Sequence, residues 1–179
     1  MPAIFAKMMK QEGLKDEVIR TFMAYYQKLK EGEKGYISKA QITPPGKDNL
    51  LQYDDLKSLA DPKMLKNIAV IKLNGGLGTS MGLSKAKSLL PVKGNMNFLD
   101  IISRQILTLR AQSGYDVLLL FMNSYNTEAD TLEYLGKYPD LGRQELPLSF
   151  VQNKFPRIRQ DNLQPFEAID KAKMWNPPG

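Results

Sequence analysis

The sequence predicts an α/β protein built on a parallel β-sheet, and three observations support this fold class. Three short apolar runs, at residues 68–73, 116–123 and 148–153, have the length and composition of strands buried in a sheet. Segments of helical periodicity separate these runs, and such alternation produces right-handed crossovers between parallel strands. A glycine-rich stretch at residues 75–82 follows the first run directly.

Residues 1–62 are predicted to form a helical extension followed by a connector. Apolar residues recur at helical spacing on one face of the first part: Leu14, Val18, Phe22, Tyr25 and Leu29. Gly32 and Gly35 are expected to end this helix. Two prolines and a glycine make residues 36–52 irregular, and a short helix at 53–61 is expected to stop before the next proline.

Residues 63–179 are predicted to hold the sheet, beginning with the strand at 68–73. The run at residues 88–92 is too short to assign. Asn97 is expected to cap the helix that follows, with Asp100 as its partner in a capping box. The apolar face of this helix is predicted to consist of Phe98, Ile102, Ile106 and Leu109.

Gly114 is expected to end this helix, and the second strand follows it. Asn126 or Thr127 then caps a shorter helix, which stops near Gly136. The third apolar run completes the predicted sheet.

Composition excludes several kinds of chemistry. The 179-residue chain contains neither cysteine nor histidine, so Ser-His-Asp and Cys-His catalysis and zinc sites built from those residues are excluded. Reactions must use lysine, arginine, carboxylates, hydroxyls, backbone amides and a hard metal ion. The net charge of +6 favours anionic partners. Aromatic residues are not interleaved with a basic patch, so no nucleic-acid surface is expected.

The sequence predicts a soluble, cytoplasmic protein without a membrane partner. No apolar stretch is long enough to span a bilayer. The first residues, MPAIFAKMMKQEG, carry lysines within their apolar run and no small-residue cleavage site, which is not typical of a secretory signal.

The glycine-rich stretch is predicted to bind a phosphate-bearing ligand. Ligands of open α/β sheets bind at the carboxyl ends of strands, and glycine lets a ligand approach the backbone closely. Successive exposed amides form an anion site. Lys85 and Lys87 add positive charge beside it. The alternative is a tight turn with solvated lysines.

Two familiar phosphate-binding templates do not fit this stretch. A Rossmann dinucleotide loop needs Gly-x-Gly-x-x-Gly, whereas three residues separate Gly78 from Gly82. A Walker A loop needs a glycine before its lysine, and Ala86 stands there.

The motif KLNGGLGTSMGLSKAKS instead resembles the nucleotide-binding loop of eukaryotic-type UDP-glucose pyrophosphorylases, also called UTP–glucose-1-phosphate uridylyltransferases. Five further segments resemble that family in the same order, so that the resemblance covers roughly residues 40–179: ITPPGKDNLLQYDDL, NFLDIISRQILTL, FMNSYNTEADTLEYL, FVQNKFPRI and WNPPG.

This resemblance implies a Rossmann-like sheet of the nucleotide-diphosphosugar transferase type, of which residues 63–179 are the first part. It implies the conversion of UTP and glucose 1-phosphate to UDP-glucose and pyrophosphate with Mg²⁺. It also implies site roles. Lys87 would be the catalytic lysine that reaches the phosphates, Gln152 would read uracil, and the nucleotide would be held by Leu73, Asn74, Gly75, Gly76, Gly78, Thr79 and Gly179.

The chain departs from the family pattern in two places. The family commonly has Gly-Pro-Lys where this chain has Lys85-Ala86-Lys87, and Lys85 is expected to be a surface residue. The family's metal-binding aspartate and sugar-binding residues follow the Pro-Pro-Gly segment, so no metal ligand is expected within residues 1–179.

From this second departure we expect an incomplete domain that is inactive alone. Its first strand would become an open edge, which would seek a second copy or the remaining C-terminal portion. The alternatives are a non-catalytic nucleotide-binding fragment and a pyrophosphorylase for another UDP-sugar. An NAD-dependent oxidoreductase is disfavoured by the glycine spacing.

Overall fold

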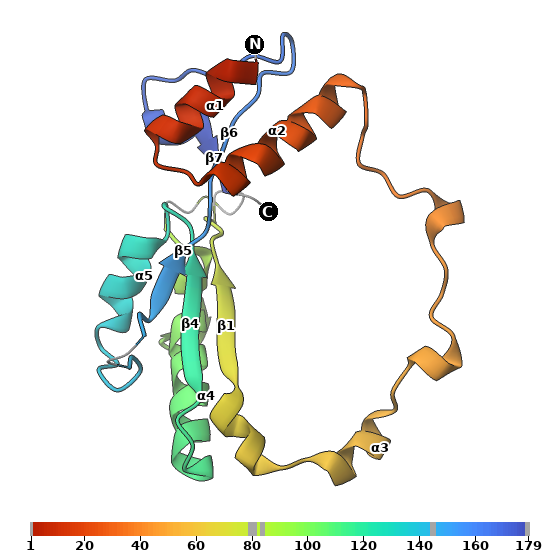
Figure 1. Ribbon diagram of the computed structural model, residues 1–179. Coiled ribbons are helices and arrows are strands. Elements are labelled where there is room, and N and C mark those ends of the chain that lie inside the picture. The colour runs from red at the N-terminus through yellow and green to blue at the C-terminus, as the bar shows by residue number, and fades with distance from the viewer. Residues whose placement is uncertain (1, 79–81, 83–84, 144–145, 178–179) are drawn as a thin grey trace.

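A three-stranded parallel sheet is the centre of the computed structural model, which describes residues 2–78, 82, 85–143 and 146–177. Figure 1 shows its strands side by side in the order β1 (Ala69–Asn74), β4 (Leu118–Asn123) and β5 (Ser149–Val151). The parallel sheet and its three predicted strands are therefore confirmed.

Two helices connect the strands and pack on the sheet: α4 (Phe98–Ser113) and α5 (Glu128–Leu135). The predicted capping box is confirmed, because the Asp100 amide donates to the Asn97 side chain and the Asn97 amide to the Asp100 carboxylate, each at 2.9 Å. Gly114 ends α4 with a φ of 72°, and Thr127 is the residue before α5.

Asp100 is also the centre of a buried polar cluster. Lys137 Nζ lies 2.6 Å from its carboxylate, and the hydroxyls of Tyr134 and Tyr138 donate to it at 2.8 and 2.7 Å. Burial alone would raise the pKa of Asp100, but the hydrogen bonds from Lys137, the Asn97 amide and the two tyrosines outweigh it. The pKa of Asp100 is therefore held well below its ordinary value.

Only one face of the sheet is covered among the described residues. Leu119 and Phe121 of β4 are buried under α4 and α5, with Val70 of β1 beside them. On the opposite face Ile71 is 52% exposed and Leu73 is 77% exposed. The prediction of a buried first strand is wrong for that face, whereas the predicted open edge is confirmed, since β1 pairs with β4 alone within the described ranges.

An antiparallel hairpin, β2 (Pro91–Lys93) with β3 (Met96–Asn97), occupies the unassigned region before α4. The buried residues of α4 itself are Leu99, Asp100, Ser103, Ile106 and Arg110. Of the predicted face, Ile106 is buried and Ile102 packs against the same cluster, whereas Phe98 is 46% exposed. Apolar residues at neighbouring positions make the apolar face of α4 broad, and the position of the sheet decides which of them are buried.

The N-terminal part is a hairpin of two helices, α1 (Pro2–Gln11) and α2 (Asp16–Lys30), of which only α2 was predicted. The hairpin packs on a second small antiparallel pair, β6 (Phe155–Pro156) with β7 (Trp175–Asn176), as Figure 1 shows. Phe22 is buried as predicted, with Val18 packed on the same cluster, but Tyr25 is 65% exposed and Tyr26 is buried in its place. The aromatic partners in α1 and β6 decide this orientation.

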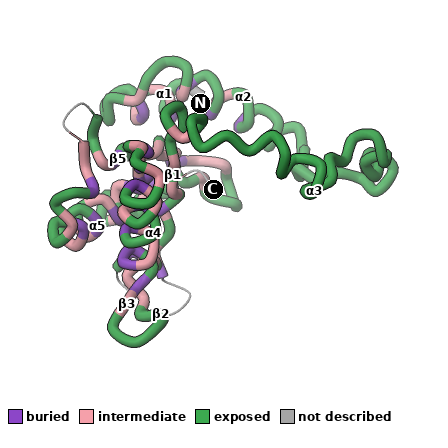
Figure 2. The backbone as a smooth tube through the Cα atoms, turned by 90° about the horizontal axis from the view of Figure 1, so that it is seen from below, coloured by how far each residue is buried: buried purple, intermediate pink, exposed green. Residues whose placement is uncertain are grey.

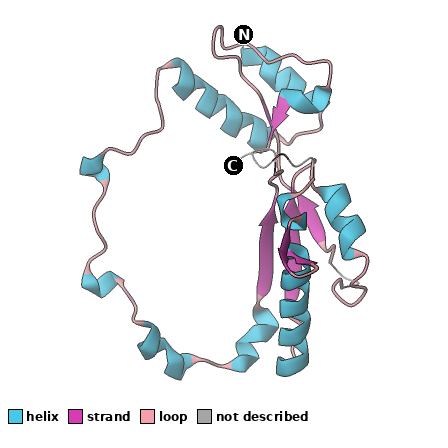
Figure 3. Cartoon of the chain, turned by 180° about the vertical axis from the view of Figure 1, so that it is seen from behind, coloured by secondary structure: helices cyan, strands magenta, loops and turns pink. Residues whose placement is uncertain are grey.

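The connector between α2 and β1 extends away from both packed regions. Residues 27–64 are all exposed, and Figure 2 shows this segment projecting from the molecule. Figure 3 shows short helices along it, namely α3 (Tyr53–Leu56) and 3₁₀ turns at Lys39–Gln41, Lys47–Asn49 and Lys57–Leu59, before a 3₁₀ helix at Pro62–Asn67. The predicted irregular connector and short helix are confirmed. No helix within the described ranges is long and apolar enough to cross a membrane.

Candidate functional site

The glycine loop folds back on itself at the carboxyl end of β1. The Gly78 amide donates to the Lys85 carbonyl at 3.3 Å, and the Lys87 amide donates to the Gly76 carbonyl at 3.0 Å. Leu77 and Ala86 face each other between these two hydrogen bonds. The chain reversal therefore returns Lys87 to the end of β1.

Gln152 meets the same loop from β5. Its amide donates to the Asn123 carbonyl at 2.7 Å, which fixes its backbone beside the end of β4. A Cβ at residue 75 would overlap Nε2 of Gln152 and lie 3.1 Å from its Cδ. Gly75 and Gln152, predicted separately as site residues, are thus in contact, and the contact needs the missing side chain of glycine.

Buried polar side chains lie beneath the loop. The Asn74 side-chain amide donates to Asn123 Oδ1 at 2.7 Å and to Thr131 Oγ1 at 2.8 Å. Thr127 Oγ1 donates to the Asn74 carbonyl at 2.7 Å. Both amide hydrogens of Asn74 are therefore used inside the protein, so that a ligand would not receive them.

Glu128 extends this network to the third strand. One carboxylate oxygen accepts from the Asn123 side chain at 2.6 Å, and the other accepts from Ser149 Oγ at 2.5 Å. The network was not predicted. Its only signal in the sequence is that a polar residue stands at the carboxyl ends of β1 and β4 and at the start of β5.

One hollow beside the loop, called the lysine hollow below, has a volume of about 380 Å³. Two lysines, Lys72 and Lys87, line it without a carboxylate, so its wall is positively charged. The buried Ser88 Oγ has no hydrogen-bond partner within the described part of the chain. The other lining residues are Leu73, Asn74, Gly76, Phe98, Ile102 and Phe121.

A second hollow, the tryptophan hollow, has a volume of about 530 Å³ and shares Gly76 with the lysine hollow. Arg157 and Lys173 contribute two positive charges and Asp170 one negative charge. Arg157 Nε donates to the Asn176 side chain at 2.8 Å, which orients the guanidinium. The other lining residues are Gly75, Gly76, Leu77, Tyr125, Asn126, Ala172, Trp175 and Pro177.

The structure therefore brings together most of the predicted site residues. Leu73, Asn74, Gly76 and Lys87 line the lysine hollow, whereas Gly75 and Gly76 line the tryptophan hollow. Gly78 is buried in the base of the loop, and Lys85 lines neither hollow. Thr79 and Gly179 lie outside the described residues.

Sequence reasoning assigned no role to Tyr125, Arg157, Lys173 or Trp175. Three of them lie inside segments that resemble the family, which was the available signal. In the ranges that the structure describes, no group of three or more carboxylate, histidine or cysteine side chains could hold a metal ion.

Comparisons of the sequence with a family model and with curated proteins agree on one family. The family model described as UTP–glucose-1-phosphate uridylyltransferase matches residues 19–179. A protein of that name from Solanum tuberosum is 37% identical over 156 residues, covering 83% of this chain and 32% of its own length. Another from Saccharomyces cerevisiae is 40% identical over 142 residues, covering 78% of this chain and 28% of its own length.

Solved structures agree with these sequences. A mutant UDP-glucose pyrophosphorylase from Leishmania major in complex with UDP-glucose is 35% identical, with a TM-score of 0.87 over 99% of this chain and 37% of that chain. A Trypanosoma brucei structure is 33% identical, with a TM-score of 0.86 over 99% of this chain and 38% of that chain. The chain spans about a third of the length of the curated relatives it matches.

Proposed function

Since the chain belongs to the UTP–glucose-1-phosphate uridylyltransferase family, we propose that it carries the uridine-nucleotide-binding part of an enzyme of that activity. The reaction joins UTP and glucose 1-phosphate to give UDP-glucose and pyrophosphate. The observation that carries the proposal is the contact between Gln152 and Gly75, beside two positively charged hollows.

In this proposal Gln152 reads the uracil ring. A glutamine amide has one donor group and one acceptor oxygen, and uracil offers the complementary pair on one edge. Because the hydrogen bond to the Asn123 carbonyl anchors its backbone directly after β5, the side-chain amide enters the site from a fixed position. The backbone of Leu73, Asn74, Gly75, Gly76 and Gly78 holds the nucleotide, together with Thr79 and Gly179.

The phosphates then face the lysine hollow. The attacking oxygen belongs to glucose 1-phosphate and is already ionised, so the reaction needs no histidine base. It needs positive charge and oriented donors around the α-phosphoryl group during in-line displacement. Lys87 supplies that charge, and its backbone bond to Gly76 holds it at the loop.

Mg²⁺ is part of the proposed activity, where it would neutralise charge on the transferring phosphates. The described residues do not form a metal site, and the roles of Gln152 and Lys87 do not depend on the ion. We therefore propose that residues 1–179 alone release no pyrophosphate, and that the partner that completes the enzyme is its C-terminal portion, since a second copy would bring the same residues. The cytoplasmic location stays a prediction from the sequence.

Ligand-induced thermal shifts of this chain test the proposal. UTP and UDP-glucose are expected to raise its unfolding temperature, because a ligand that binds only the folded state stabilises it. Uridine without phosphate, ATP and NAD are the controls and should raise it less. A larger shift with ATP or NAD than with either uridine nucleotide would contradict the proposed function.

A further inference from the structure

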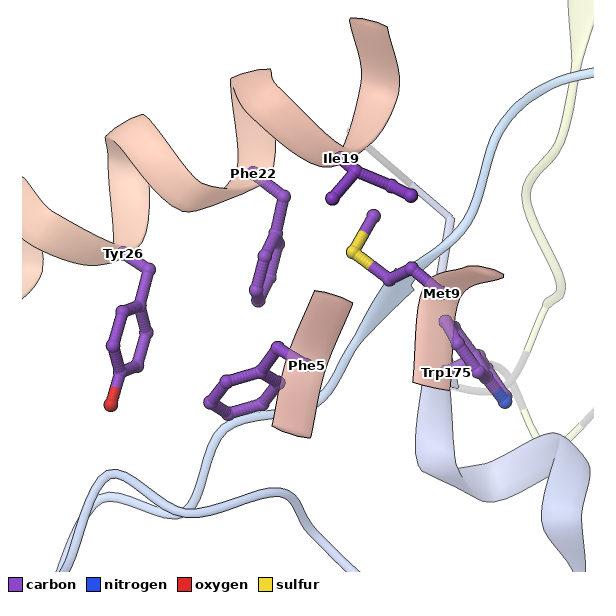
Figure 4. Close-up of a cluster of buried hydrophobic side chains, with 6 residues drawn as sticks. All are labelled: Phe5, Met9, Ile19, Phe22, Tyr26 and Trp175. Carbon is purple, nitrogen blue, oxygen red and sulfur yellow. The ribbon is translucent and has the colours of Figure 1, made fainter. Parts of the chain in front are cut away.

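The α1–α2 hairpin packs against a residue that also forms the wall of the tryptophan hollow. Figure 4 shows the indole of Trp175 at one end of the hairpin's buried cluster, next to Met9. The remaining buried members of the cluster are Phe5, Ile19, Phe22 and Tyr26. Trp175 is therefore shared between the N-terminal helices and the candidate site.

Tyr125 completes this shared wall. Its hydroxyl donates to the Trp175 carbonyl at 2.7 Å, and both residues line the hollow that Gly75 and Gly76 face. Tyr125 follows β4, whereas Trp175 belongs to β7, so the hydrogen bond joins the parallel sheet to the small antiparallel pair. A shift of either side chain would change the shape of the hollow.

Lys154 connects the hairpin to both rings. Its Nζ lies 2.5 Å from a carboxylate oxygen of Glu12, 4.9 Å from the ring centroid of Trp175 and 5.7 Å from that of Tyr125. Glu12 directly follows α1. The Lys154 side chain is only 23% exposed, so this pair is less screened by water than an ordinary surface ion pair.

Lys154 also stands close in sequence to the proposed uracil reader. Gln152 is bonded to Asn123 on one side of this segment. On the other side, the ring of Phe155 lies 5.6 Å from that of Phe22 in α2. The segment is thus held at one end by the sheet and at the other end by the hairpin.

We propose that Glu12 is a positioning residue for the nucleotide site. Its carboxylate keeps Lys154 over Trp175 and Tyr125, so that the N-terminal hairpin fixes the wall of the tryptophan hollow and the segment that carries Gln152. The ligand side of this inference rests on the proposed function, since the ligand in question is a uridine nucleotide.

Trp175 is the only tryptophan of the chain, so its fluorescence reports on this wall alone. Glu12→Gln in the 179-residue chain is expected to increase quenching of Trp175 by acrylamide. It should also weaken UTP binding about threefold to tenfold, the scale of one ordinary hydrogen bond, because the Glu12 side chain is 40% exposed. Asp16→Asn is the matched control, because Asp16 pairs with Lys10 at 3.9 Å, with both side chains largely exposed.

Lys154→Met should reproduce both effects of Glu12→Gln. Lys154→Arg should largely restore wild-type quenching, because it keeps the charge, and this separates positioning from a general loss of folding. If acrylamide quenched Trp175 no more in Glu12→Gln than in wild type and in Asp16→Asn, the proposal would be overturned. If wild type itself binds no UTP, the proposed function fails, whereas the quenching comparison still decides whether Glu12 positions the wall.

Discussion

The side-chain amide of Gln152 occupies the space that a Cβ at residue 75 would need. Gln152 directly follows β5 and Gly75 directly follows β1, so the two residues meet where the parallel strands end. The absence of a side chain at Gly75 therefore decides where Gln152 points. Under the proposed function, this contact links the phosphate loop to the recognition of the base.

Gly75→Ala is accordingly expected to act through Gln152. The atoms that would clash belong to the end of a flexible side chain, so we expect the free energy of unfolding to fall by less than about 1 kcal/mol. Discrimination of UTP from CTP should nevertheless fall, because Gln152 must turn away. Chemical denaturation and nucleotide titrations measure the two effects. Gly142→Ala is the control, since nothing lies within 4 Å of its added Cβ. Unchanged discrimination in Gly75→Ala would contradict this relationship.

The two lysines of the loop should differ in their effects on binding. Lys87→Ala is expected to weaken UTP binding at least about tenfold while leaving the affinity for uridine unchanged, because it removes a charge from the lysine hollow. Lys85→Ala should change the affinity for UTP less than about twofold, because Lys85 lines neither hollow. Isothermal titration with UTP and uridine separates the two cases. Equal losses would show that the wrong lysine was assigned.

Asp100 should make the fold sensitive to acid. Its pKa is lowered in the folded state, so the unfolded chain binds the proton more tightly and the stabilisation is complete only above the unfolded pKa of about 3.9. The stabilisation is lost as the pH falls from there toward the lower pKa of the folded state. Asp100→Asn should lower the free energy of unfolding by about 2 kcal/mol at neutral pH. It should also flatten the dependence of that free energy on pH below about pH 4.

Denaturation at a series of pH values measures this dependence. The control is Glu133→Gln, since Glu133 is an exposed carboxylate on α5. If the free energy of unfolding of Asp100→Asn fell with pH as steeply as that of wild type below about pH 4, the prediction would be wrong and another carboxylate would account for the acid sensitivity.

The open side of β1 should cause self-association of the chain when it is studied alone. Ile71 and Leu73 are exposed beside a strand edge that is unpaired in the described part of the chain, and such edges pair with other chains. Ile71→Lys is expected to reduce the apparent mass in light scattering, because a charge opposes burial of that face. Ile42→Lys adds the same charge to an exposed apolar residue of the connector and should have less effect. A monodisperse wild-type monomer would refute this prediction.

Elements with strong local signals could be predicted from the sequence, and those set by tertiary contacts could not. The capping box of Asn97 with Asp100 and the strand before Gly75 each follow from neighbouring residues. The exposed face of Ile71 could not be predicted, because the sequence pattern is that of a strand covered on both sides. Tyr26 is buried instead of Tyr25 because Phe5 of α1 packs against its ring, with the two centroids 5.0 Å apart.

The candidate site likewise contains residues that local sequence signals predict and residues that only tertiary contacts bring together. The glycine loop could be predicted as a phosphate site because phosphate binding needs bare backbone and positive charge together, and the role of Lys87 was predicted from the family resemblance. The network of Asn74, Asn123 and Glu128 depends on the parallel register of β1 and β4, which no local pattern reports. Trp175 and Tyr125 lie 50 residues apart in the sequence, and only the folded chain brings them together through the hydrogen bond that joins them.

The most direct test of the central claim is the ratio of the dissociation constants for CTP and UTP, measured by equilibrium titration of wild type and Gln152→Ala. We expect wild type to prefer UTP at least about tenfold, since a site that hydrogen-bonds one base leaves its polar groups unpaired with the other. Gln152→Ala should bring the ratio close to one through weaker binding of UTP. A wild-type ratio near one, or a Gln152→Ala variant that keeps the full preference, would contradict the assignment of this site to a uridine nucleotide read by Gln152.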